Sequence, residues 1–235
     1  MTALVLLPGL DGTGLLFRPL VQALSKDIDP VVVSYPNDVP LGYQELLPLV
    51  HEALPSRPFV LLGESFSGPL AIMAAAGGQA ELRGVILCAS FVRSPVACLP
   101  GWCAHLVRPF VFRFYPAVAR LRLLLGRHAD PTIRDLAVQA VSRVHSSVLA
   151  HRVRAVHRVD VEKQLASCPL PVLYLRGQHD RVVPASAMRR VLRACPHAQV
   201  VTLPAPHMVL QTQPAAAAAA IQTFVQFCGV AATHG

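Results

Sequence analysis

The sequence predicts an α/β fold in which a mostly parallel six-stranded sheet is flanked by helices and carries a helical insertion. Short apolar runs alternate with helix-like segments, and one gap between runs is far longer than the others. Each run is continuously apolar for about five residues, as in strands that are covered on both faces. Strands are expected at Thr2–Leu7, Pro30–Tyr35, Pro58–Leu62, Arg83–Ala89, Leu170–Leu175 and Ala198–Leu203.

The segments between these runs have the length and apolar spacing of crossover helices. A repeated strand, helix, strand order implies right-handed units and a parallel sheet. The alanine run 215–220 is continued at helical spacing by Ile221, Phe224 and Val225, which favours a helix over a low-complexity tail. Helices are expected at Phe17–Ser25, Leu41–Leu54, Phe66–Gln79, Ala185–Cys195 and Pro214–Cys228.

The insertion lies between the fourth and fifth runs, which are separated by about eighty residues where one helix would need about fifteen. Pro100, Pro109, Pro116 and Pro131 interrupt it, and no glycine- or serine-rich linker borders it. We therefore expect residues 91–165 to form a helical cap within a single domain that spans residues 1–235. The cap contains five aromatic residues: Trp102, Phe110, Phe112, Phe114 and Tyr115. The first four are expected to line an acyl channel or a membrane-facing side, or else to pack between helices.

Composition excludes several classes of protein. With 53% apolar and 14% charged residues among 235, the chain is not a disordered one. No apolar run reaches the roughly 18 residues of a membrane span, and the N-terminal run lacks the basic segment and cleavage site of an export signal. A cytoplasmic location is expected. The six cysteines form no C-x-x-C pair and the histidines do not converge at metal-ligand spacing, so no metal site is expected.

The net charge of +8 is concentrated in the insertion. Eleven arginines and three acidic residues lie between Phe91 and Asp160, whereas the ten basic and ten acidic residues elsewhere cancel. A basic cap favours an anionic partner, such as an acyl carrier protein, a coenzyme or an acidic membrane surface. A solvated face that only keeps the protein soluble is the alternative.

The stretch FVLLGESFSG places Ser65 where the third strand must turn into a helix. A serine in such a turn adopts a strained backbone that projects its hydroxyl away from the sheet, and small neighbours allow strand and helix to approach. Gly63 and Ser67 are those neighbours. Ser67 stands where the usual elbow has glycine, and it is itself an alternative nucleophile.

A serine hydroxyl needs a base to remove its proton and a third group to orient that base. Asp180 follows the fifth run and His207 follows the sixth, so all three residues should meet at the carboxyl edge of the sheet. His179 is an alternative base, and Asp180 could instead serve only as an acid at a helix N-terminus. The chain order is serine, aspartate, histidine.

Through Pro8-Gly9-Leu10-Asp11-Gly12, Gly63-Glu64-Ser65-Phe66-Ser67, Gly177-Gln178-His179-Asp180 and Pro206-His207, the chain resembles the α/β-hydrolase superfamily over nearly its whole length. The resemblance implies that Ser65 is the nucleophile, His207 the general base and acid, and Asp180 the carboxylate that fixes the tautomer. It also implies an oxyanion hole formed by the backbone N–H groups of Leu10 and Phe66. Pro8 stands where many relatives carry histidine, and a similar LPG turn occurs in some esterases, thioesterases and acyltransferases.

We expect a serine hydrolase that cleaves a small acyl ester through an acyl-Ser65 intermediate, without a cofactor. Thioester cleavage and acyl transfer use the same groups, and a peptidase is less favoured. A noncatalytic module that binds an acidic partner is the alternative from another class. Nucleotide binding is disfavoured because the segment from Gly12 to Phe17 lacks the last glycine of G-x-G-x-x-G, and no specific nucleic-acid partner is expected.

Overall fold

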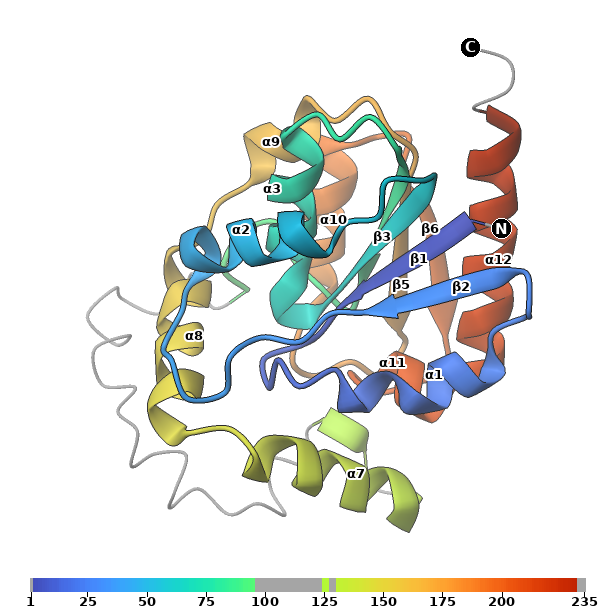
Figure 1. Cartoon of the computed structure of the whole chain (residues 1–235). Helices are drawn as coiled ribbons and strands as arrows, with labels where there is room; N and C mark the ends of the chain where they lie inside the picture. The colour runs from blue at the N-terminus through green and yellow to red at the C-terminus, as the bar shows by residue number, and fades with distance from the viewer. Residues whose placement is uncertain (1, 96–123, 127–129, 232–235) are drawn as a thin grey trace.

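The computed structural model describes residues 2–95, 124–126 and 130–231. Six parallel strands form one sheet in the order β2-β1-β3-β4-β5-β6 (Figure 1). The α/β class and the six-stranded parallel sheet predicted from the sequence are therefore confirmed. The strands are β1 (Thr2–Leu7), β2 (Ile28–Val32), β3 (Phe59–Glu64), β4 (Leu82–Cys88), β5 (Val172–Gly177) and β6 (Gln199–Leu203).

The second strand begins at Ile28, two residues before the predicted start at Pro30. It ends at Val32, three residues before the predicted end at Tyr35. Beyond the end of β2, the Val33 N–H still donates to the Leu6 carbonyl at 3.0 Å, Ser34 is exposed, and Tyr35 is buried. The backbone N–H of Tyr35 donates to the carbonyl of Gly12, 2.7 Å away, in the turn after β1. The apolar run thus continues because Tyr35 is buried beneath that turn and not because the strand is longer.

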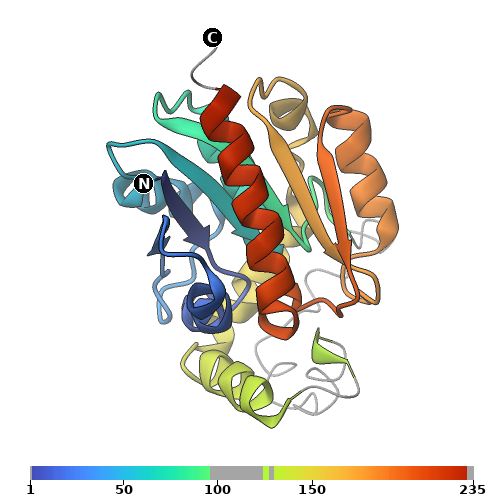
Figure 2. The same ribbon diagram turned by 90° about the vertical axis from the view of Figure 1, so that its right-hand side faces the viewer.

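Helices cover both faces of the sheet (Figures 1 and 2). One face carries α1 (Arg18–Ala23), α11 (Val209–Thr212) and α12 (Pro214–Ala231), whereas the other carries α2 (Tyr43–Ala53), α3 (Gly68–Ala76), α9 (Glu162–Ala166) and α10 (Ala185–Ala194). Two short 3-10 turns, η1 (Leu15–Phe17) and η2 (Ser65–Ser67), precede α1 and α3.

The strands are apolar at successive positions because both of their faces are buried. In β1, Ala3, Val5 and Leu7 pack into the core beneath α2 and α3. Leu4 and Leu6 pack into the opposite core beneath α1 and α12. This double burial explains the absence of period-two alternation in the sequence.

The chain between β4 and β5 is helical in its described part, with α7 (Pro131–Ser142) and α8 (Ser146–Arg158) preceding α9. The Asp130 side chain caps α7 by accepting the backbone N–H of Thr132 at 2.7 Å, and Pro131 occupies the first turn. The five aromatic residues assigned to the cap, from Trp102 to Tyr115, lie outside the described residues. None of the helices in the described part of the chain is long and apolar enough to cross a membrane.

Gly84 in β4 allows α12 to pack closely on the sheet. A Cβ atom at this position would lie 2.6 Å from Cys228 Sγ and 3.1 Å from the Phe224 ring. Gly84→Ala should lower the free energy of unfolding by about 1–3 kcal/mol through overpacking, as measured by urea denaturation. Gly229→Ala is the matched control, because nothing lies within 4 Å of its Cβ position. Equal stability losses in the two variants would contradict this account of the packing.

Candidate active site

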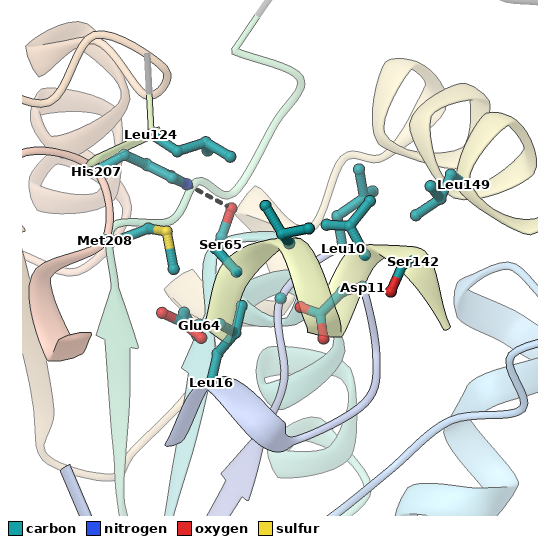
Figure 3. Close-up of a pocket in the computed structure, with 14 residues that line it drawn as sticks. Leu10, Asp11, Leu16, Glu64, Ser65, Leu124, Ser142, Leu149, His207 and Met208 are labelled. Atoms are coloured by element: carbon teal, nitrogen blue, oxygen red, sulfur yellow. Dashed lines mark hydrogen bonds between the residues drawn. The ribbon is translucent and has the colours of Figure 1, made fainter. Parts of the chain in front are cut away.

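Ser65 occupies a sharp strand-to-helix turn with a left-handed backbone, φ 48°. The turn is tight because a Cβ atom on Gly63 would lie 2.4 Å from the Ser67 carbonyl oxygen, and one on Gly68 would lie 1.8 Å from Ser90 Oγ. Only glycine allows β3 and α3 to approach this closely. The geometry is that of the strained elbow expected from the sequence, and the Ser65 side chain faces the cavity in Figure 3.

Ser65, His207 and Asp180 form a continuous hydrogen-bonded chain. Ser65 Oγ lies 2.9 Å from His207 Nε2, and His207 Nδ1 lies 2.9 Å from Asp180 Oδ2 (Figure 3 shows the first of these bonds). The three residues follow β3, β6 and β5, so the parallel sheet brings them to one edge. The structure thus brings together the three residues predicted from the sequence.

Asp180 is held on both of its oxygens. Oδ1 accepts the backbone N–H groups of Val182 and Val183 at 2.8 and 2.9 Å, which leaves Oδ2 for His207. Its side chain is only 2% exposed. Asp180 therefore bonds the turn that precedes α10 and the imidazole at the same time. It does not lie in the first turn of α10, which begins at Ala185.

The alternative residues are placed differently. Ser67 is fully buried, and its hydroxyl donates to the Pro8 carbonyl and lies 2.7 Å from the Tyr35 hydroxyl. His179 is exposed, and Asp180 bonds His207 instead. Neither Ser67 nor His179 has the surroundings that a nucleophile or a base would need.

The N–H groups of Phe66 and Leu10 share peptide planes with the carbonyl groups of Ser65 and Gly9. Each of these carbonyl oxygens accepts a hydrogen bond that fixes its plane. Ser90 Oγ donates to the Ser65 carbonyl at 2.6 Å, and the Gly12 N–H donates to the Gly9 carbonyl at 3.0 Å. Because a trans peptide is planar, each bond also orients the N–H on the opposite side of the plane. The two predicted oxyanion donors are therefore fixed before any substrate binds.

The cavity beside Ser65 has a volume of about 310 Å³ and a mostly apolar lining. Its outer wall comes from α7 and α8, and its floor from the turns after β1, β3 and β6 (Figure 3). Such a cavity suits an aliphatic acyl chain next to a few polar groups. The apolar lining is Leu10, Leu16, Leu124, Ala137, Val138, Val141, Leu149 and Met208, and the polar side chains are Asp11, Glu64, Ser65, Ser142 and His207.

Glu64 places a buried carboxyl group directly before the serine. Burial raises the pKa of Glu64 to about 7, against the opposing effect of a 2.8 Å hydrogen bond from Gln211, and nearby Asp11 raises it further. The Asp11 carboxylate accepts the backbone N–H and the hydroxyl of Thr13. Turn bonding thus accounts for the Asp11 carboxylate, whereas Glu64 is a titratable group that lines the cavity.

Sequence reasoning missed three residues of the site. Ser90 fixes the Ser65 carbonyl, and Tyr43 donates to the Phe66 carbonyl at 3.0 Å while its ring stacks on the Phe66 ring. Arg152 contacts the turn after β1. Of these three residues, only Ser90 has a position in the sequence that could have suggested a place in the site, because it lies just beyond a strand at the same sheet edge.

A family model described as serine aminopeptidase, S33, matches residues 36–209, about three quarters of the chain. The chain belongs to this family. Its predicted place in the α/β-hydrolase superfamily is thereby confirmed. Among solved structures, an enol-lactonase from Burkholderia xenovorans has a TM-score of 0.82 at 20% identity, covering 96% of this chain and 91% of that one. An esterase from Exiguobacterium antarcticum has a TM-score of 0.81 at 12% identity, covering 96% and 92%.

Curated relatives of this S33-family chain carry a more specific name. A pimeloyl-[acyl-carrier protein] methyl ester esterase from Xanthomonas campestris pv. campestris is 29% identical over 224 residues, which cover 86% of this chain and 85% of the relative. The enzyme of the same name from Stenotrophomonas maltophilia is 29% identical over 218 residues, covering 85% and 83%.

The raised pKa of Glu64 predicts a pH-dependent stability. Between about 4.5, the ordinary value, and about 7, the unfolded chain releases the Glu64 proton while the folded chain retains it. The free energy of unfolding should therefore fall across this window as pH rises. In Glu64→Gln this fall should be smaller by on the order of 3 kcal/mol, as measured by urea denaturation at pH 4.5 and 7.5. Exposed Glu52→Gln should follow the wild-type profile, and a Glu64→Gln profile parallel to wild type would refute the assignment.

Proposed function

We propose that this carboxylic ester hydrolase works through an acyl-enzyme formed on Ser65. The observation that supports the proposal is the continuous Ser65–His207–Asp180 chain beside an apolar cavity. His207 takes the Ser65 proton as Oγ attacks the ester carbonyl, and Asp180 stabilises the resulting imidazolium. The Leu10 and Phe66 N–H groups then stabilise the developing oxyanion.

The same groups complete acylation and then carry out deacylation. To end acylation, the His207 imidazolium gives its proton to the departing alkoxide, so an alcohol leaves and the acyl group stays on Ser65. In deacylation, a water molecule gives a proton to His207 as its oxygen attacks the acyl carbonyl, and His207 returns that proton to Ser65 Oγ as the ester bond breaks and the carboxylic acid leaves. An acyl thioester would enter the same path, and acyl transfer would replace water by another alcohol.

For the substrate, we propose an ester at the end of an acyl chain whose other end is carried by an acidic acyl carrier protein. The Xanthomonas and Stenotrophomonas relatives are named for such a substrate, and the apolar cavity suits its chain. Arg143 is exposed directly after Ser142, which lines the cavity. A positive charge there would attract an anionic carrier to the cavity mouth.

Ser65→Ala should abolish covalent labelling by a fluorophosphonate probe and lower kcat on a short-chain p-nitrophenyl ester by roughly 10⁴-fold or more. Ser186→Ala, which changes an exposed serine of α10, should keep both labelling and activity. Continued labelling of Ser65→Ala would refute the assigned nucleophile. Binding of an acidic partner by a chain that is never labelled would favour the noncatalytic module.

The carrier-linked substrate predicts a salt dependence. At low salt, kcat/KM for a pimeloyl methyl ester on an acyl carrier protein should exceed that for the free monomethyl ester of pimelic acid. The advantage should shrink as salt rises and in Arg143→Glu, because screening and charge reversal both weaken the attraction. Equal values for the two substrates at low salt would reject the carrier while leaving the serine esterase intact.

A further inference from the structure

Arg152 is an arginine of the basic insertion that does not face solvent. It lies on α8, and its exposed fraction is 0%. Along the chain, Arg152 is one of the eleven arginines that make the insertion basic. Burial removes Arg152 from any surface that an anionic partner could reach, so its positive charge must serve another purpose.

The Arg152 guanidinium binds three backbone carbonyl groups. Nη1 donates to the carbonyls of Leu10 and Asp11 at 2.9 and 2.8 Å, and Nη2 donates to that of Pro36 at 2.8 Å. The guanidinium carbon also lies 5.5 Å from the centroid of the Tyr35 ring. Charge-assisted bonds in a buried setting are the stronger class of hydrogen bond, and the planar fork fixes their directions.

Leu10 and Asp11 are the two central residues of the turn that contains a predicted oxyanion donor. The turn is closed by the 3.0 Å bond from the Gly12 N–H to the Gly9 carbonyl. Arg152 packs directly against it, since a Cβ atom on Gly12 would lie 2.4 Å from Nη1 and Gly12 has φ +72°. Glycine at position 12 therefore allows the left-handed backbone of the turn and leaves room for the Arg152 guanidinium.

The other side of the same turn is tied to the serine elbow. Ser67 Oγ donates to the Pro8 carbonyl and also lies 2.7 Å from the Tyr35 hydroxyl, which is itself buried. The turn that carries the Leu10 N–H thus has α8 on one side, through Arg152, and the elbow on the other, through Ser67.

We infer that Arg152 is a positioning residue that holds the Leu10 N–H in the oxyanion hole and makes this hole depend on the seating of α8. The inference rests on the proposed function, because it assigns the Leu10 N–H to the transition state. An oxyanion donor acts mainly as negative charge develops, so displacing it should reduce kcat more than substrate binding. A helix of the insertion would then control catalysis as well as enclose the cavity.

The test measures kcat and KM of Arg152→Lys and Arg152→Ala on a short-chain p-nitrophenyl ester that carries no carrier protein. Lysine keeps the positive charge but cannot bond three carbonyls in one plane. In both variants kcat should fall about 10- to 100-fold, and KM should stay within about threefold of wild type. Displacing an oxyanion donor can lower kcat by no more than removing the donor would. Millimolar guanidinium chloride, far below denaturing concentrations, should restore part of the kcat of Arg152→Ala.

Arg158→Ala is the matched control, because it removes an exposed arginine from the last turn of α8 and should leave kcat unchanged. Urea denaturation verifies that each variant is folded, and Arg152→Lys serves if the alanine variant is not. An unchanged kcat in folded Arg152→Lys, or a loss confined to KM, would overturn the inference. A folded Arg152→Ala variant whose low kcat is not raised by guanidinium would also overturn the inference. A wild-type enzyme that is neither labelled on Ser65 nor active on esters would reject the proposed function instead.

Discussion

The left-handed backbone at Ser65 is the constraint on which the site depends. A non-glycine residue in this region costs on the order of 1–3 kcal/mol, and it persists only where the surroundings over-determine it. Here Gly63 and Gly68 leave room for the close approach of β3 and α3, and Ser90 holds the Ser65 carbonyl. The same arrangement directs the hydroxyl toward His207 and orients the Phe66 N–H. The strain is therefore stored where the proposed nucleophile and one predicted oxyanion donor lie.

Asp180 and Glu64 are two buried carboxyl groups of the site with different hydrogen-bond partners. Asp180 accepts two backbone N–H groups on one oxygen and bonds the His207 ring through the other. Glu64 accepts one amide N–H from Gln211. Burial raises the pKa of Glu64 to about 7, because the single amide donor only partly opposes the loss of water around the carboxylate.

Two arginines in the described part of the insertion have contrasting surroundings. Arg152 is enclosed and bonds the turn after β1, whereas Arg143 is exposed beside the cavity wall. A count of charges along the chain cannot distinguish these positions, because both contribute equally to the net charge of +8. Arg152 thus contacts the site from within α8, whereas exposed side chains such as Arg143 are available for the proposed attraction of an anionic partner. Helices of the insertion then shape the cavity, orient a turn and present charge.

By itself, the sequence determined the parallel sheet and the three residues at its carboxyl edge, because continuous apolar runs imply double burial and parallel strands end on the same side. It also placed Ser65 in a tight turn through Gly63 and the residues that follow. The early end of β2 could not be foreseen, since Tyr35 is buried through its contact with the turn after β1 and not by strand pairing. Ser90, Tyr43 and Arg152 likewise required the tertiary structure. Their partners lie 25, 23 and more than 100 residues away, and a hydrogen bond to a backbone carbonyl leaves no mark on the identity of the residue that accepts it.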